Sequence, residues 1–352
     1  MMDIRESEKE EIKMLFNTPI KINNMELQNR IVMAPMGEST ADLQGHVTDK
    51  TINYYLSRAK GGFGLIETGI MYAEINGKVG LNQLSASKDD DIDGLSQLAS
   101  AIHNNSNSKI IAQINHAGYS KNPATGGEIV APSNCVKPWK VTENLPRAMT
   151  IEEIHNTIEY FAQAAYRLKK AGFDGVEFHS CHGNLLNMFY SPLTNKREDE
   201  YGYQTLENRV RIHKEIITRA RELCGRDFVM TFRLGCSDYY PGGTTIEESV
   251  QVAKWMQEWT ADIISVTGGQ KGYLKPENNE PGFFRDLSMP IKKAVDICVM
   301  GAGGVTNGQQ LEQVLQDNVA DIFGIARQAL KNPNFGNDVY KEFGIQVGSE
   351  HE

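Results

Sequence analysis

The sequence lacks the features of several protein classes. Its five cysteines, at positions 135, 181, 224, 236 and 298, form no Cys-x-x-Cys pair, and such wide spacing is typical of a reduced compartment without a zinc or iron–sulfur centre. The N-terminus stays charged as far as Lys13, so it has no apolar signal-peptide core. No apolar run is long enough to span a bilayer. We therefore expect a cytoplasmic protein without a membrane anchor.

Basic clusters, repeats and low-complexity tracts are also missing. The net charge is −9, and the lysines and arginines are scattered, which argues against a nucleic-acid surface or a polybasic membrane patch. No repeat is longer than one strand–helix unit. With 352 residues, of which 40% are hydrophobic, the chain can bury a large core without disulfide or metal support.

Short apolar segments alternate with helical patterns along the whole chain. The expected strands are 30–33, 64–68, 109–115, 175–178, 228–234, 263–267, 298–301 and 322–325. Such alternation predicts a parallel sheet, and eight units favour a single-domain (β/α)8 (TIM) barrel over an open doubly wound sheet, which stays the alternative. The barrel would span 14–340, with terminal extensions at 1–13 and 341–352. Residues 20–27 have the pattern of a hairpin that closes the barrel bottom.

Several helices carry a start signal. Thr150 with Glu153 and Thr245 with Glu248 match the capping box, in which hydroxyl and carboxylate satisfy each other's backbone N–H groups. Weaker patterns predict helices over 89–102 and 307–315. These helices separate the strands and support the barrel.

A phosphate site is expected after the last two strands, where such barrels commonly hold one. Gly303 and Gly304 belong to a glycine-rich run that opens a helix, and Ala326-Arg327 follows strand eight. Glycines let backbone N–H groups approach an anion, and an arginine can bind phosphate through two parallel bonds. The alternatives are a tight turn and a surface arginine bonded to a carboxylate.

Two strands carry polar side chains where apolar ones are expected. Arg233 interrupts an apolar strand, and a buried charge there must be paired; it points either outward to a helix carboxylate or inward, to stabilise an anionic ring. Gln113 offers a donor and an acceptor, as the pyrimidine edge of a flavin requires. A satisfied core amide explains Gln113 equally well.

A histidine pair follows strand four. His179 and His182, three residues apart, can both face the barrel mouth and donate hydrogen bonds to a substrate carbonyl oxygen. The alternative is that each is structural. With His116, after strand three, they could instead form a zinc site in a hydrolase or lyase.

These residues, in this order, resemble the Old Yellow Enzyme family of FMN-dependent ene-reductases, especially its bacterial branch near the barrel domain of 2,4-dienoyl-CoA reductase. The resemblance covers about residues 15–335. Its most specific segments are Asn-Arg-Ile-Val-Met-Ala-Pro-Met at 29–36, Gln-Ile-Asn-His-Ala-Gly at 113–118, and the run at 191–202 followed by Glu-Asn-Arg at 207–209. The family's longer members add a cysteine-rich iron–sulfur segment, and this sequence lacks those cysteines.

The resemblance implies a cofactor, a reaction and a set of site residues. FMN would contact Pro35, Met36, Gly37, Gly69 or Ile70, Gln113, Arg233, Gly303, Gly304, Ala326 and Arg327. His179 and His182 would bind the substrate carbonyl oxygen. In this family NADH or NADPH reduces FMN, and hydride then passes to the β-carbon of an activated alkene, while the protein supplies orientation and electrostatics. Family members are often oligomers, so a homo-oligomer is an open expectation.

The sequence departs from the family at two site positions. Asn184 stands where a tyrosine usually donates the proton to the α-carbon, so the proton must come from elsewhere, with Tyr119, Cys181 and water as candidates. Gly37 stands where Cys or Thr often tunes the flavin O4. These departures leave open a different FMN reaction, such as amine or ring dehydrogenation or a solvent-protonated reduction, and also a non-catalytic flavin binder.

Overall fold

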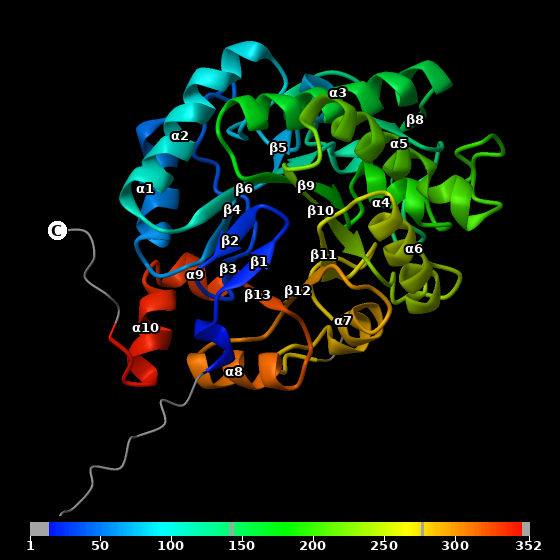
Figure 1. Cartoon of the computed structure of the whole chain (residues 1–352). Helices are drawn as coiled ribbons and strands as arrows, with labels where there is room; N and C mark the ends of the chain where they lie inside the picture. Colours follow the sequence, from blue (N-terminus) through cyan, green and yellow to red (C-terminus); the bar gives the residue numbers. More distant parts are fainter. Residues whose placement is uncertain (1–13, 141, 143, 276–277, 347–352) are drawn as a thin grey trace, which may run out of the picture.

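A ring of parallel strands forms the centre of the computed structural model, which describes residues 14–346 except 141, 143, 276 and 277 (Figure 1). Among these residues eight strands complete the ring. Their order is β3 (Ile31–Met33), β4 (Leu65–Glu67), β6 (Lys109–Asn115), β9 (Gly175–Ser180), β10 (Val229–Gly235), β11 (Ile263–Thr267), β12 (Cys298–Ala302) and β13 (Ile322–Ile325). Because β13 pairs with β3 and β4 pairs with β6, the predicted closed barrel is confirmed and the open sheet is wrong.

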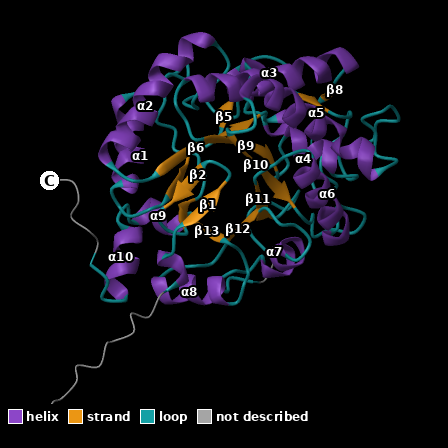
Figure 2. Ribbon diagram, in the orientation of Figure 1, coloured by secondary structure: helices purple, strands orange, loops and turns teal. Residues whose placement is uncertain are grey.

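A helix follows each barrel strand and covers its outer face (Figure 2). These helices are α1 (Asp49–Ala59), α2 (Ile92–Asn105), α3 (Ile151–Lys170), α5 (Leu206–Cys224), α6 (Ile246–Glu258), α7 (Arg285–Lys292), α8 (Gly308–Gln316) and α10 (Phe335–Glu342). Both predicted capping boxes are present, at the starts of α3 and α6. No helix in the described part of the chain is long and apolar enough to cross a membrane.

One expected helix starts later than its pattern indicated. Residues Asp89–Asp91 form a 3-10 turn, and α2 begins only at Ile92. The carboxylate of Asp91 accepts hydrogen bonds from the Lys88 amide at 3.1 Å and the Ser85 hydroxyl at 2.6 Å. The local polar contacts of these aspartates therefore compete with α-helical geometry.

The predicted hairpin closes the N-terminal end of the barrel. Strands β1 (Ile20–Ile22) and β2 (Met25–Leu27) pair antiparallel, and Asn23 in the turn has a left-handed φ of 52°, which asparagine tolerates better than most residues. The hairpin lies in front of the strand ring in Figure 1. Its buried side chains pack against the first inward-facing residues of the barrel strands.

The barrel interior changes from apolar to polar along the strands. The layer next to the hairpin, here called the lower layer, contains Val32, Leu65, Ile111, Val229, Ile263, Met300 and Ile322. Two residues further along, a buried polar layer contains Glu67, Gln113, Glu177, Thr231 and Ser265. Alternate residues of a strand share a face, so both layers point inward. The polar layer lies on the side of the C-terminal strand ends.

Candidate functional site

A cavity of about 950 Å³ lies at the C-terminal ends of the strands. Twelve of the thirteen site residues predicted from sequence line it. They are Pro35, Met36, Gly37, Gln113, His179, His182, Asn184, Arg233, Gly303, Gly304, Ala326 and Arg327. A volume of this size suits a cofactor together with a small substrate.

Gly69 is the residue that does not line the cavity. A Cβ atom at this position would lie 2.1 Å from Oε2 of Glu38 and 2.2 Å from the carbonyl oxygen of Met36. The Gly69 amide donates a hydrogen bond to the Tyr55 hydroxyl at 2.8 Å. Gly69 therefore allows the loop after β3 to approach closely, and its neighbour Ile70 faces the cavity instead.

The glycine-rich turn after β12 has a backbone that only glycine adopts easily. Gly303 and Gly304 have φ values of 112° and 74°, and a Cβ atom on Gly304 would lie 2.2 Å from the carbonyl oxygen of Glu280. Arg327, which lines the same cavity, is the first residue of the short helix α9 (Arg327–Lys331). Among the described residues no carboxylate lies within ion-pair distance of Arg327, so the surface ion pair considered from sequence is not formed.

The polar layer contains more charge than the sequence analysis recognised. Gln113 donates a hydrogen bond through Nε2 to Oε1 of Glu177 at 2.6 Å, so it is both a bonded core amide and a cavity residue. Glu67 and Glu177 are fully buried near Arg233. The signal that could have identified both glutamates is the one used for Arg233: a charge within an apolar strand.

Burial controls the protonation of the two buried glutamates, Glu67 and Glu177. It raises the pKa of Glu67, and the negative charge of Glu177 raises that pKa further. Burial also raises the pKa of Glu177, against the opposing effect of Arg233. In the described structure both carboxylate oxygens of Glu67, and Nε and Nη1 of Arg233, have no hydrogen-bond partner. Arg233 opposes the charge of both carboxyls without pairing directly with Glu67, so burial and the repulsion from Glu177 favour the protonated form of Glu67.

The two histidines form a close pair above this layer. β9 extends two residues beyond its expected end, so that His179 lies within the strand, and the ring centroids of His179 and His182 are 5.4 Å apart. His182 has a φ of 57°, and its Nε2 lies 3.0 Å from the hydroxyl of Thr267. Thr267 lines the cavity but was not predicted, although its place at the end of a strand is a signal.

Both imidazoles are neutral near pH 7. Burial lowers the pKa of His179 to about 3, and the positive charge of Arg233 contributes. Burial also lowers the pKa of His182 well below its usual value, with the neighbouring His179 as the next cause. A neutral imidazole donates one hydrogen bond and accepts another, so the pair can bind a carbonyl oxygen without adding net charge to the cavity.

Asn184 supports the first histidine. Its amide Nδ2 lies 3.1 Å from Nε2 of His179, and its Oδ1 accepts a hydrogen bond from the Asn115 amide at 3.3 Å. Of the proton sources considered from sequence, Cys181 is fully buried and Tyr119 nearly so, and neither lines the cavity.

The three histidines of the alternative zinc site do not converge. His116 does not line the cavity, and its Nε2 lies 3.0 Å from Oε1 of Glu74. In the described residues the ligand atoms that do lie within 4.8 Å of one another belong to His179, Cys181 and His182. The alternative set that includes His116 is therefore not assembled among the described residues.

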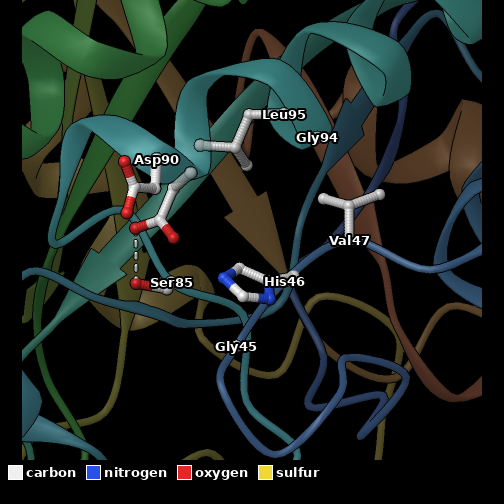
Figure 3. A pocket seen from close by; sticks show the side chains of 8 residues that line it. Gly45, His46, Val47, Ser85, Asp90, Gly94 and Leu95 are labelled. Atoms are coloured by element: carbon white, nitrogen blue, oxygen red, sulfur yellow. Dashed lines mark hydrogen bonds between the residues drawn. The ribbon is translucent and has the colours of Figure 1, made fainter.

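A second, smaller cavity of about 230 Å³ lies beside the start of α2 (Figure 3). His46, Val47 and Leu95 are among the side chains that line it. Asp91 also lines it and accepts a hydrogen bond from the Ser85 hydroxyl. No predicted site residue lines this cavity. The functional assignment therefore concerns the larger one.

Comparisons with known proteins agree with this geometry. The model of the NADH:flavin oxidoreductase / NADH oxidase family matches residues 14–344. The chain is 37% identical to an NADPH dehydrogenase of Bacillus cytotoxicus, over 95% of this chain and 94% of that protein. It is 36% identical to an NADH oxidase of Thermoanaerobacter brockii, over 90% of this chain but only 49% of that protein, so it spans about half the length of that relative.

Solved structures show the same barrel. A 2-naphthoyl-CoA reductase in complex with 2-naphthoyl-CoA has a TM-score of 0.87 and 30% identity, covering 93% of this chain and 52% of that one. An Old Yellow Enzyme homologue from Zymomonas mobilis has a TM-score of 0.81 and 24% identity, covering 95% and 94%. The predicted family is thereby confirmed: the chain belongs to the NADH:flavin oxidoreductase / NADH oxidase family, with the barrel of the Old Yellow Enzymes.

Proposed function

We propose that the protein uses FMN to reduce activated C=C bonds of small carbonyl compounds, with NADH or NADPH as electron donor. The observation that carries this proposal is the pair of neutral imidazoles, His179 and His182, in the same cavity as Gln113 and Arg233. The sequence resemblance assigns Gln113 and Arg233 to the flavin. It assigns His179 and His182 to the substrate. The cavity has room for both molecules.

The residues present fit FMN. Arg233 has two buried nitrogen atoms without a partner among the described residues, and such atoms require an acceptor. Gly303 and Gly304 present backbone to the cavity in a conformation that glycine adopts easily, and Arg327 supplies a positive charge to the same cavity. When bound, FMN supplies the transfer of hydride from the nicotinamide to the substrate.

The substrate side has three supporting roles. His179 and His182 donate hydrogen bonds to the carbonyl oxygen, which withdraws electron density from the conjugated alkene and makes its β-carbon accept hydride. Asn184 holds the ring of His179 in place. An amide is not an acid, so water supplies the proton to the α-carbon in this proposal.

The test replaces both histidines by alanine in the FMN-loaded protein. We expect the kcat/KM for 2-cyclohexenone to fall by about 10²-fold or more, as when an oxyanion-stabilising donor is removed, while bleaching of the flavin by NADH or NADPH is retained. His155→Ala, an exposed residue of α3, is the control. Unchanged enone binding and turnover in the double variant would reject the substrate role.

Asn184 favours a second candidate function, because a residue that cannot donate a proton suits oxidation of an amine or a saturated ring. Asn184→Tyr distinguishes the two. If the reduction relies on water only because an acid is missing, enone turnover rises by about tenfold or more, within the range that general acids supply. A fall in turnover would show that Asn184 binds a specialised substrate.

A further inference from the structure

Three lysines from two separate loops meet beside the histidine pair. A Cβ atom on Gly183 would lie 2.5 Å from both Cε and Nζ of Lys137, so this side chain covers the turn between His182 and Asn184. Burial lowers the pKa of Lys137 to about 8, against the opposing charge of Asp238, and the charges of Lys140 and Lys271 lower it further. Lys137 therefore lies within electrostatic range of both other ammonium groups.

Asp238, the carboxylate whose charge acts on Lys137, already accepts three hydrogen bonds from other groups. Asp238 accepts a hydrogen bond from the Ser191 hydroxyl at 2.6 Å and from the Thr244 and Gln270 amides at 2.9 and 2.7 Å. In the described parts of the chain no carboxylate lies within 4.0 Å of Lys137, Lys140 or Lys271. Lys275, only four residues away, does pair with Asp286 at 2.8 Å. Among the described residues, Lys137 is therefore opposed by the charge of Asp238 without forming an ion pair with it.

Aromatic rings hold the ammonium groups in position. The rings of Trp139 and Tyr240 lie 4.7 Å apart, and Nζ of Lys271 lies 4.2 Å from the first ring centroid and 5.3 Å from the second. Nζ of Lys140 lies 5.0 Å from the ring centroid of Tyr119. Cations are attracted to such ring faces, so the lysines are partly ordered before a ligand binds.

The cluster adjoins the substrate side of the cavity. His182 and Asn184 line the cavity on either side of Gly183. Tyr273, two residues after Lys271, also lines it, and its ring lies 5.9 Å from that of His182. A substrate bound to the histidines could therefore extend a substituent toward the lysines.

We propose that Lys137, Lys140 and Lys271 form a subsite for a negatively charged group, carboxylate or phosphate, on the substrate whose carbonyl oxygen binds the histidine pair. The proposal rests on the proposed function and narrows its substrate class to anionic enones. An anion in this place offsets the repulsion that Lys140 and Lys271 exert on Lys137, and the same charges steer it toward the cavity.

The test compares two ligands of equal shape: a cyclohexenone with a ring carboxylate, and its carboxamide. Each is titrated into the oxidised FMN enzyme without nucleotide, and its Kd is obtained from the change in flavin absorbance. We expect the carboxylate to bind about tenfold more tightly at low salt, and to lose most of this advantage in 1 M salt, where the screening length falls to about 3 Å. A cyclohexenone phosphate ester, titrated in parallel, shows which anion the subsite prefers.

Two triple variants give the decisive comparison. In Lys137→Met/Lys140→Met/Lys271→Met the ratio of the two Kd values should fall toward one. The control, Lys50→Met/Lys214→Met/Lys254→Met, removes the same charge from exposed positions of α1, α5 and α6 and should keep the ratio. Equal binding of both ligands by the unaltered enzyme, or an equal effect of the two variants, would overturn the subsite alone. Failure of any enone to perturb the flavin would overturn the proposed function and the subsite with it.

Discussion

The lower layer and the polar layer of the barrel lie only two residues apart on the same strands, yet one is apolar and the other is polar and partly charged. Leu65 and Ile111 belong to an apolar cluster that the hairpin completes. Glu67 and Gln113 follow them into a layer with buried polar atoms, some of which have no partner in the described structure. The lower layer contributes stability through apolar burial, whereas the polar layer accepts an electrostatic cost at the cofactor end. Such local conflicts are expected at functional sites.

The comparison is tested most strongly by removing Arg233, the buried cation that lies beside the two glutamates of the polar layer. Arg233→Met leaves Glu67 and Glu177 buried without a positive charge, so we expect the free energy of unfolding to fall by about 3–5 kcal/mol at pH 8 and FMN binding to be lost. Urea unfolding and flavin titration measure these effects. Arg226→Met, whose exposed guanidinium pairs with Asp262, is the control and should cost less than about 1 kcal/mol. Equal small losses in both variants would contradict the account.

A substitution in the lower layer should separate stability from function. Leu65→Ala removes a fully buried side chain, so we expect a loss of about 3 kcal/mol in the free energy of unfolding, the middle of the range for such cavities. FMN affinity should stay within about threefold, because the polar layer lies between Leu65 and the cofactor cavity. A much larger loss of affinity would show that the two layers are not independent.

The smallest effect concerns the proton of the polar layer. The pKa of Glu67 is raised in the fold, so the folded protein keeps a proton that the unfolded chain loses above pH 4.3 or so, and stability falls as pH rises toward the raised pKa. Glu67→Gln has no such proton. Its stability advantage over the unaltered protein should therefore grow with pH, by at most about 1.4 kcal/mol per unit.

Urea unfolding of both proteins at pH 5, 6, 7 and 8 measures this difference. Glu222→Gln, at an exposed position on α5, provides the control and should give a flat difference. A flat difference for Glu67→Gln as well would mean that Glu67 is ionised in the folded protein at all four pH values.

The sequence predicted the barrel because each strand is a short apolar run followed by a helical pattern. Both signals depend only on residues that are close together in the chain. The sequence also predicted which strand ends carry the site, since parallel strands bring their C-terminal ends to one edge. His179 illustrates the limit. Two polar residues ended the apolar pattern of β9, but backbone pairing with β10 continues through them.

Other features depend on contacts between distant segments. Glu67 and Glu177 give weak signals separately, and only the closed barrel places them beside Arg233. The approach of Lys137 and Lys140 to Lys271 depends on how two loops fold over the barrel mouth. Gly69 was expected at the flavin, but the crowding by Glu38 that requires a glycine there is visible only in three dimensions.

The central claim is that hydride passes from a nicotinamide nucleotide through FMN to an enone, and an anaerobic absorption spectrum tests it most directly. The purified protein is mixed first with NADH or NADPH and then, after removal of the nucleotide, with 2-cyclohexenone. The account predicts a flavin spectrum that one or both nucleotides bleach and that the enone restores. A protein without bound flavin that also takes up no added FMN, or a reduced flavin that the enone leaves bleached, would contradict it.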